Sequence, residues 1–200
     1  LSCSLALCLS LSLSLSVGWL VDWLVGWRCC SLWIVSIMSS QPDLDVALRV
    51  AADKGWLEEI RSLLHRRANI NAVDTYKWTP LHYASINGHH QCVELLLDRG
   101  ANINAVDTDK WTPLHYASLN DHHQCIELLL DRHANINAVD KYNDTPLHDA
   151  SRNGHHQCIE LLLDRGANIN AVSYDNSTPL HFASCYGHHQ CIELLIDRGA

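Results

Sequence analysis

Apolar residues recur in the later part of the chain with the spacing of short amphipathic helices. After Thr79 and Pro80, Leu81 and Ala84 lie three positions apart, the spacing of one helical face. A second apolar stripe follows and consists of Cys92, Val93, Leu96 and Leu97. Gly88 interrupts the pattern between the stripes, and another glycine follows the second one. The pattern predicts two short helices followed by an extended turn.

The start of the first helix carries a capping signal that repeats along the chain. A threonine at the N-cap accepts a hydrogen bond from an unpaired backbone N–H, and proline at the first helical position loses no needed donor. This Thr-Pro pair returns with a period of 33 residues, at Thr79, Thr112, Thr145 and Thr178. A fixed period of this kind indicates a repeat architecture. Because helices this short are unstable alone in water, the copies must bury their apolar faces against one another.

Three sequence features of the unit resemble the ankyrin repeat. They are TPLH from Thr79 to His82, a Gly-His pair that opens the second helix at Gly88, and LLLDRGANINA from Leu95 to Ala105. The resemblance covers about Asp43 to Ala200. It implies an all-α ankyrin-repeat solenoid, in which stacked helix pairs carry projecting hairpin loops and bind other proteins.

The repeats divide the chain into three parts. Residues 38–74 form a degenerate first copy, which keeps the core positions but lacks the Thr-Pro pair, so we expect an N-terminal capping repeat. Residues 75–200 contain four repeats, of which the last is truncated. If the array ends there, we expect the apolar face near Ile192 and Leu195 to lie bare.

Residues 1–37 form a low-complexity segment rich in Leu, Ser and Trp, which we expect to be non-globular. One interpretation is read-through of a leader, because alternating Leu-Ser is the translation of a CT-dinucleotide tract and Met38 is the only methionine. The protein would then be cytoplasmic. The alternatives are a signal or anchor, which would make the protein secreted or membrane-associated, and a packed structural segment. A membrane partner is expected only if residues 1–37 are retained.

Several residues occupy positions that favour glycine. Asp121 and His133 stand where other copies have glycine, and Lys77 and Lys110 fill a hairpin position where ankyrin repeats usually have glycine. A non-glycine residue at positive φ is strained, so we expect the third copy, residues 107–139 when the capping repeat is counted as the first, to be the least stable.

Differences among the copies concentrate in two windows, the hairpin tip and the end of the first helix. Shared positions are needed for stacking, whereas variable positions are free to bind, and the resemblance places both windows on the concave face. The predicted contact residues are Tyr76, Trp78, Ile86, Trp111, Leu119, Tyr142, Asp144, Arg152, Tyr174 and Tyr186. Drift after duplication is the alternative explanation. If binding is their role, replacing Trp78 and Trp111 with alanine weakens partner capture and leaves the melting temperature nearly unchanged.

The sequence offers little support for other functions. The net charge is −8 and the basic residues do not cluster, so we expect no nucleic-acid partner. His89 and Cys92 supply two donors on one helix face, but zinc needs four, so we predict no metal and no cofactor. His82 and Ser85 recur together in every copy, which is unlike a single catalytic centre, so we predict no enzyme and no small-molecule substrate. The resemblance implies instead that the TPLH histidines link neighbouring loops.

Overall fold

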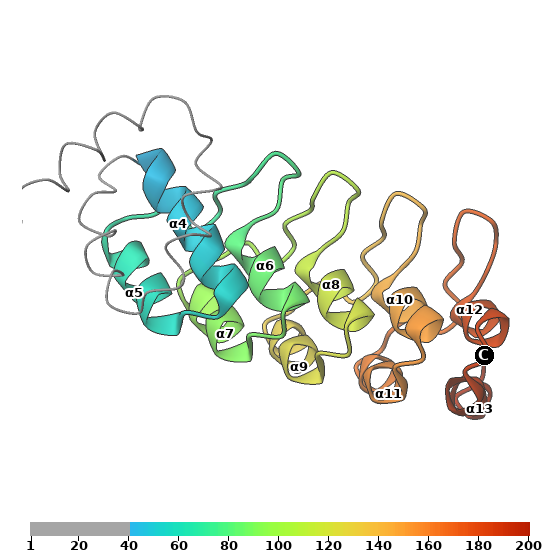
Figure 1. Ribbon diagram of the computed structural model, residues 1–200. Coiled ribbons are helices and arrows are strands. Elements are labelled where there is room, and N and C mark those ends of the chain that lie inside the picture. The colour runs from blue at the N-terminus through green and yellow to red at the C-terminus, as the bar shows by residue number, and fades with distance from the viewer. Residues whose placement is uncertain (1–40) are drawn as a thin grey trace, which may run out of the picture. The chain divides into compact units, whose positions relative to one another are not determined.

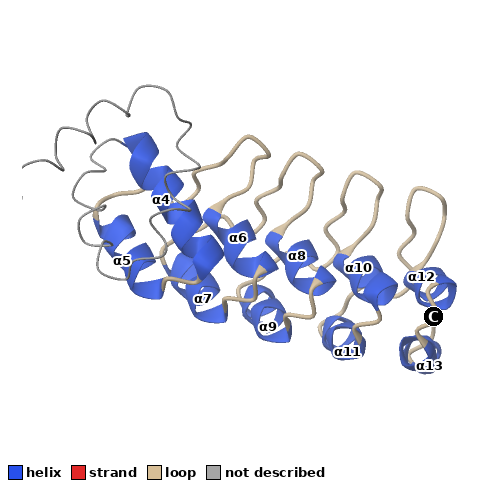
Figure 2. Ribbon diagram, in the orientation of Figure 1, coloured by secondary structure: helices blue, strands red, loops and turns tan. Residues whose placement is uncertain are grey.

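Ten helices lie along residues 41–200, the part of the chain that this computed structural model describes (Figure 1). The first pair is α4 (Gln41–Lys54) and α5 (Leu57–His65). The four following pairs are α6 (Pro80–Ile86) and α7 (His90–Asp98), α8 (Pro113–Leu119) and α9 (His123–Asp131), α10 (Pro146–Asn153) and α11 (His156–Asp164), and α12 (Pro179–Cys185) and α13 (His189–Asp197). Turns and loops join them, and no strand occurs within residues 41–200 (Figure 2). The all-helical repeat architecture is confirmed, whereas the interpretations of residues 1–37 lie outside the described residues.

The predicted capping signal operates in each copy from α6 onward. The Thr79 backbone N–H donates to Nδ1 of His82 over 3.1 Å, and the His82 N–H donates to Oγ1 of Thr79 over 3.4 Å. Proline occupies the first turn of each of these helices. The threonine and the histidine therefore satisfy each other's backbone and fix where the helix starts.

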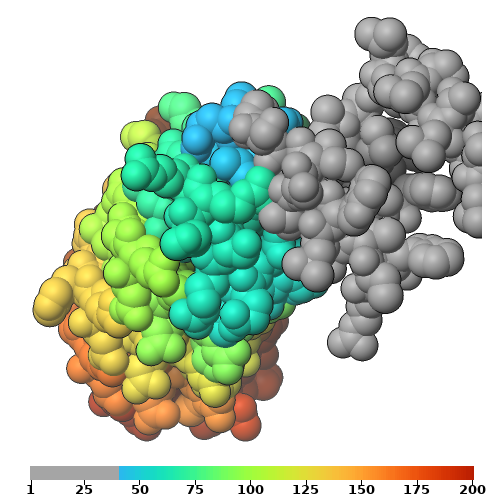
Figure 3. Space-filling view, turned by 90° about the vertical axis from the view of Figure 1, so that its left-hand side faces the viewer, coloured from blue at the N-terminus to red at the C-terminus, as the bar shows by residue number. Residues whose placement is uncertain are grey.

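The helix pairs stack in two rows. The first helices of the pairs pack on one another in order, from α4 through α6, α8 and α10 to α12 (Figure 1). The second helices form a parallel row below them, from α5 through α7, α9 and α11 to α13. Viewed from the α4 end, the later repeats lie behind the earlier ones and are stepped to one side (Figure 3). The core between the rows consists of side chains at most 1% exposed, among them Leu48, Leu81, Leu96, Leu114, Leu129, Leu147 and Leu162. Each such side chain contributes about 1.5–3 kcal/mol by burial, so stability is spread over the interfaces.

The loops between repeats project beyond the row of first helices (Figure 1). Backbone hydrogen bonds join each loop to the next. Thr108 N–H donates to the Tyr76 carbonyl over 3.1 Å, Lys141 N–H to the Asp109 carbonyl over 3.0 Å, and Tyr174 N–H to the Tyr142 carbonyl over 2.8 Å. The loops are therefore a connected edge of the array, and their tips have a defined spacing.

An asparagine ladder joins the repeats a second time, after the second helices. Asn102 N–H donates to Oδ1 of Asn71 over 2.8 Å, and the same bond recurs from Asn135 to Asn104 and from Asn168 to Asn137, each over 2.9 Å. The Asn-Ile-Asn sequence, which is identical in the four copies that contain it, is thus used for stacking.

Two expectations about individual positions have different outcomes. The expected positive φ angles are confirmed for Asp121 at 60° and His133 at 65°, and the hairpin positions Lys77, Lys110, Asn143 and Asn176 lie between 63° and 65°. The expected bare apolar face was wrong at Leu195, which is fully buried, whereas Ile192 is half-buried. Leu195 lies on the side of α13 that faces the core, and the exposed apolar residue of this helix is Ile196. No helix within residues 41–200 combines the length and the apolar character needed to cross a membrane.

Candidate functional site

Side-chain oxygen atoms hold the backbone of each loop tip, and in three of the four loops they belong to one aspartate. In the loop before α6, Oδ1 of Asp74 accepts the backbone N–H groups of Tyr76 and Trp78, each over 2.8 Å. Asp107 and Asp140 do the same in the next two loops. In the last loop Ser173 stands at this position, and Ser177 N–H donates to the Ser173 Oγ and to Asp175 Oδ1. The tip side chains are therefore presented on a fixed backbone.

Four of the predicted contact residues are open to solvent. Tyr76, Tyr142 and Tyr174 stand at the loop tips and are 66%, 58% and 87% exposed, and Tyr186, which follows α12, is 56% exposed. Exposed tyrosines of this kind combine an apolar ring with a hydroxyl, the composition that protein interfaces favour. These four residues are the accessible part of the predicted site.

The two tryptophans of the predicted site are half-buried in an aromatic row. The Trp78 ring lies 5.1 Å from the Tyr83 ring and 4.7 Å from the Tyr116 ring, measured between centroids. The Trp111 ring lies 5.1 Å from the Tyr116 ring, and its Nε1–H donates to Oδ2 of Asp140 over 3.1 Å. Both rings thus join loops to first helices. These contacts argue against the expectation that removal of the two rings leaves the melting temperature nearly unchanged, because they are part of the packing.

Ile86 and Leu119 lie half-buried at the ends of α6 and α8. Each backbone carbonyl forms a hydrogen bond with a histidine Nε2 of the next repeat. The Ile86 carbonyl pairs with His122 over 3.0 Å and the Leu119 carbonyl with His155 over 2.8 Å. The backbone at this position is therefore used for stacking, and only the side chain is free to vary.

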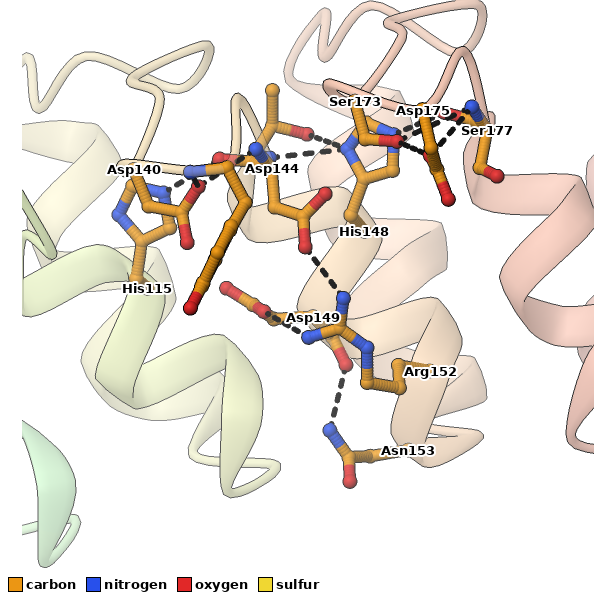
Figure 4. Close-up of polar contacts among 12 residues, drawn as sticks. His115, Asp140, Asp144, His148, Asp149, Arg152, Asn153, Ser173, Asp175 and Ser177 are labelled. Carbon is orange, nitrogen blue, oxygen red and sulfur yellow. Dashed lines mark hydrogen bonds and ion pairs between the residues drawn. The ribbon is translucent and has the colours of Figure 1, made fainter. Parts of the chain in front are cut away.

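The third full repeat, residues 140–172, has charged side chains in place of the aromatic row (Figure 4). Asp144, Asp149 and Arg152 occupy the positions that hold Trp111, Tyr116 and Leu119 one repeat earlier. Nη2 of Arg152 lies 2.5 Å from Oδ2 of Asp144, and its Nη1 lies 3.5 Å from Oδ1 of Asp149. The guanidinium also lies over the Phe182 ring, 4.4 Å from the centroid. This repeat therefore presents a chemistry to its surroundings that differs from the others.

Only one member of this cluster is accessible. The Arg152 side chain is 28% exposed, whereas the side chains of Asp144 and Asp149 are 5% and 0% exposed. Direct contact between a partner and Asp144 was predicted, and its burial argues against it in this conformation, since its carboxylate already binds Arg152. Asp144 instead positions the arginine.

Sequence reasoning missed Asp149. A signal was present, because this position holds Tyr83, Tyr116 and Phe182 in the other copies and an acid only here. Burial raises the pKa of the Asp149 carboxyl well above its usual value, although Arg152 acts in the opposite direction. A buried acid in a slot built for an aromatic ring is the least ordinary feature of the array.

The TPLH histidines link the loops, as predicted. Nε2 of His82 lies 3.1 Å from the Trp111 carbonyl, and the bond recurs from His115 to Asp144 and from His148 to Ser177 at 3.3 and 3.2 Å. Burial lowers the pKa of all three rings, to about 4 for His115. These rings are therefore neutral near pH 7 and act as structural links between loops.

Four of the five cysteines within residues 41–200 lie in the core, and Cys185 is exposed. Cys92, Cys125, Cys158 and Cys191 are buried and free, and burial raises the pKa of each thiol, to about 12 for Cys125. Such thiols are poor nucleophiles and poor metal ligands. Across residues 41–200, no three His, Cys, Asp or Glu side chains lie together as a metal ion would require.

The family described as ankyrin repeats (3 copies) matches the sequence over residues 19–107, 47–140, 104–173 and 137–200. No match to a curated protein was found.

Proposed function

The chain belongs to the ankyrin-repeat family, and from this premise we propose that it is a non-catalytic adaptor that binds a protein partner through its loop tips and the ends of its first helices. Ankyrin repeats are in general protein-interaction modules, and the family is generally non-catalytic. The proposal adds the surface to this general role. The accessible contacts are Tyr76, Tyr142, Arg152, Tyr174 and Tyr186, with the half-buried Trp78, Trp111, Ile86 and Leu119 beside them.

One observation carries the proposal. The residues that hold the array together are nearly identical between copies, whereas the exposed tip residues differ. Tyr76 and Tyr142 make no contribution to the core, yet each stands on a backbone fixed by an aspartate and by loop-to-loop hydrogen bonds. A preordered surface with exposed aromatic rings lowers the entropy cost of docking, because few groups must be immobilised on binding.

Site-specific photo-crosslinking tests this assignment. A photoreactive amino acid is placed in the 200-residue chain at Tyr76, Tyr142 or Tyr174, one position at a time. Matched control positions are Gln124 and Gln157, which are exposed on the second helices at the other side of the array. We expect the tip positions to give the same crosslinked partner and the glutamine positions to give none.

A competition experiment then separates binding from drift after duplication. The chain with Tyr76, Tyr142 and Tyr174 replaced by alanine is added as a competitor against the partner identified by crosslinking. We expect it to compete at least tenfold more weakly than the unmodified chain, whereas a Gln124→Ala and Gln157→Ala chain competes normally. Equal competition by the two variants would show that the tips drifted without a binding role.

A further inference from the structure

The charged cluster of the third repeat contains more carboxylate than it can balance. Asp144 and Asp149 share the single guanidinium of Arg152, and both carboxylates are almost fully withdrawn from water. Oδ1 of Asp144 and Oδ2 of Asp149 are buried, and neither has a hydrogen-bond partner among residues 41–200. With both acids ionised, the cluster would have a net charge of −1 and two unsatisfied oxygens in the interior.

Such a state is costly, because a buried charge without compensation loses its hydration and gains nothing in return. One proton removes the imbalance. It leaves the Asp144 carboxylate paired with Arg152 at 2.5 Å and a neutral carboxylic acid at Asp149, whose own contact with the guanidinium is the longer one, at 3.5 Å. The geometry therefore favours protonation of Asp149 over protonation of Asp144.

We infer that the Asp144, Asp149 and Arg152 cluster is a proton-binding site, in which Asp149 holds the proton and the proton count sets how tightly Arg152 is bound. With Asp149 protonated, Asp144 is the only charged partner of the arginine. When Asp149 releases the proton, two carboxylates bind the guanidinium. Arg152 is the accessible member of the cluster, so the surface of the third repeat changes with pH.

The surrounding groups support this direction. Burial, Asp144 and Asp140 all raise the Asp149 pKa, and Arg152 is the cation that opposes them. Among the elements that pack on α10, α8 contributes His115, whose Nε2 lies against the Asp144 carbonyl, and α12 contributes the Phe182 ring beside the guanidinium and is followed by Tyr186. His148 of α10 is buried with a lowered pKa, as is His115, so neither ring supplies a second cation near pH 7.

Carbon-13 NMR of the labelled 200-residue chain detects the proton directly through the aspartate carboxyl carbons. We expect one Asp resonance to titrate at a distinctly higher pH than the others. We expect this resonance to disappear in Asp149→Asn and to persist in Asp109→Asn, a matched change at a half-exposed loop carboxylate. Should Asp149→Asn fail to fold, Asp149→Tyr supplies the assignment, because tyrosine occupies this slot in the second repeat.

Two further variants test the charge count. Asp144→Asn removes the competing carboxylate, so the Asp149 titration should move to lower pH. Arg152→Leu, which introduces the residue found at Leu119, removes the cation and should move the titration to higher pH. A purely structural role for the cluster predicts neither shift.

Stability provides an independent measurement. As pH falls below the folded-state pKa of Asp149, the unfolding constant of the wild type should decrease relative to that of Asp149→Asn by up to about tenfold per pH unit, until the ordinary aspartate range is reached. If every Asp carboxyl titrates in or below the ordinary range, or if the high-pH resonance survives in Asp149→Asn and in Asp149→Tyr, the inference is wrong. Neither result affects the proposed docking role of the tips.

Discussion

His133 occupies a backbone conformation that other copies give to glycine. Its φ is 65°, its side chain is exposed, and Gly166 stands at the same position one repeat later with φ 88°. The left-handed region costs a non-glycine residue about 1 kcal/mol. We expect His133→Gly to stabilise the chain by about this amount, or a few degrees in melting temperature, measured by urea and thermal unfolding.

Gly166→His is the matched reverse change. No atom lies within 4 Å of the Cβ that a side chain would add at Gly166, so only backbone strain is introduced. The loss of stability in Gly166→His should be about as large as the gain of stability in His133→Gly. If both variants have the stability of the wild type, the left-handed strain is absorbed locally and the copy of residues 107–139, which contains His133, is not weakened by it.

Trp111 is expected to stabilise the loops although it lies in a variable window. Trp111→Ala removes a half-buried ring and the hydrogen bond to Asp140, and we predict a loss of about 2 kcal/mol, below the range for fully buried aromatic residues. Tyr174→Ala is the control, since an 87% exposed side chain should change stability by about 0.5 kcal/mol or less. Equal urea midpoints for the two variants would contradict the packing role of Trp111.

The same two residues mark how far sequence could predict the site. Variation between copies identifies Trp111 and Tyr174 equally, because it shows which positions differ and does not show which of them are buried. Burial depends on the neighbouring residues: Trp111 contacts Tyr116 and Asp140, whereas Tyr174 is 87% exposed. Asp149 was missed for a related reason, since it is buried at a position that holds an aromatic residue in the other full repeats.

At the scale of single elements, the first helices were the best predicted. Thr79 and Pro80 define the start of α6 through purely local chemistry, and local signals are readable in one sequence. Leu195 on α13 was predicted less well. Its environment is set by how α13 rotates on α12, and a stripe of four apolar residues is too broad to determine that rotation.

We expect the buried TPLH histidines to make α6, α8 and α10 sensitive to acid. His82, His115 and His148 have folded-state pKa values below the ordinary value, so the unfolded chain takes up protons first as pH falls. Stability is fully present above about pH 6.5 and is lost from there down to the folded pKa values, about 4 for His115. We expect urea midpoints to decrease steadily between pH 7 and pH 4.5.

Two variants separate this effect from general acid sensitivity. His123→Gln changes an exposed histidine on α9 and should leave the pH dependence as it is. His115→Asn should lower stability at pH 7, because the links to Thr112 and Asp144 weaken, and should flatten the curve below pH 6.5. A His115→Asn curve parallel to that of the wild type would exclude His115 as a source of the acid sensitivity.

Over the whole array, the main helix contacts join each pair to its neighbours. Arg132 also reaches back to Asp98, and Arg165 to Asp131, over 2.7 and 2.6 Å, so ion pairs follow the same order along the stack. These pairs are largely exposed and each contributes at most about 1 kcal/mol. Apolar burial between adjacent repeats therefore dominates, and cooperativity between distant repeats must pass through every interface between them.

This arrangement predicts that a defect in the middle divides the molecule. Leu129→Ala empties a fully buried position on α9 and should cost about 2–5 kcal/mol. Because α10 to α13 then communicate with α4 to α7 only through the weakened repeat, we expect unfolding to separate into two steps. Hydrogen exchange measured by mass spectrometry should show different opening free energies for residues 41–98 and 146–197 in the variant, and nearly equal ones in the wild type. Ile196→Ala, at an exposed position of α13, should keep a single transition. A single transition in Leu129→Ala as well would mean that the repeats are coupled by more than their nearest neighbours.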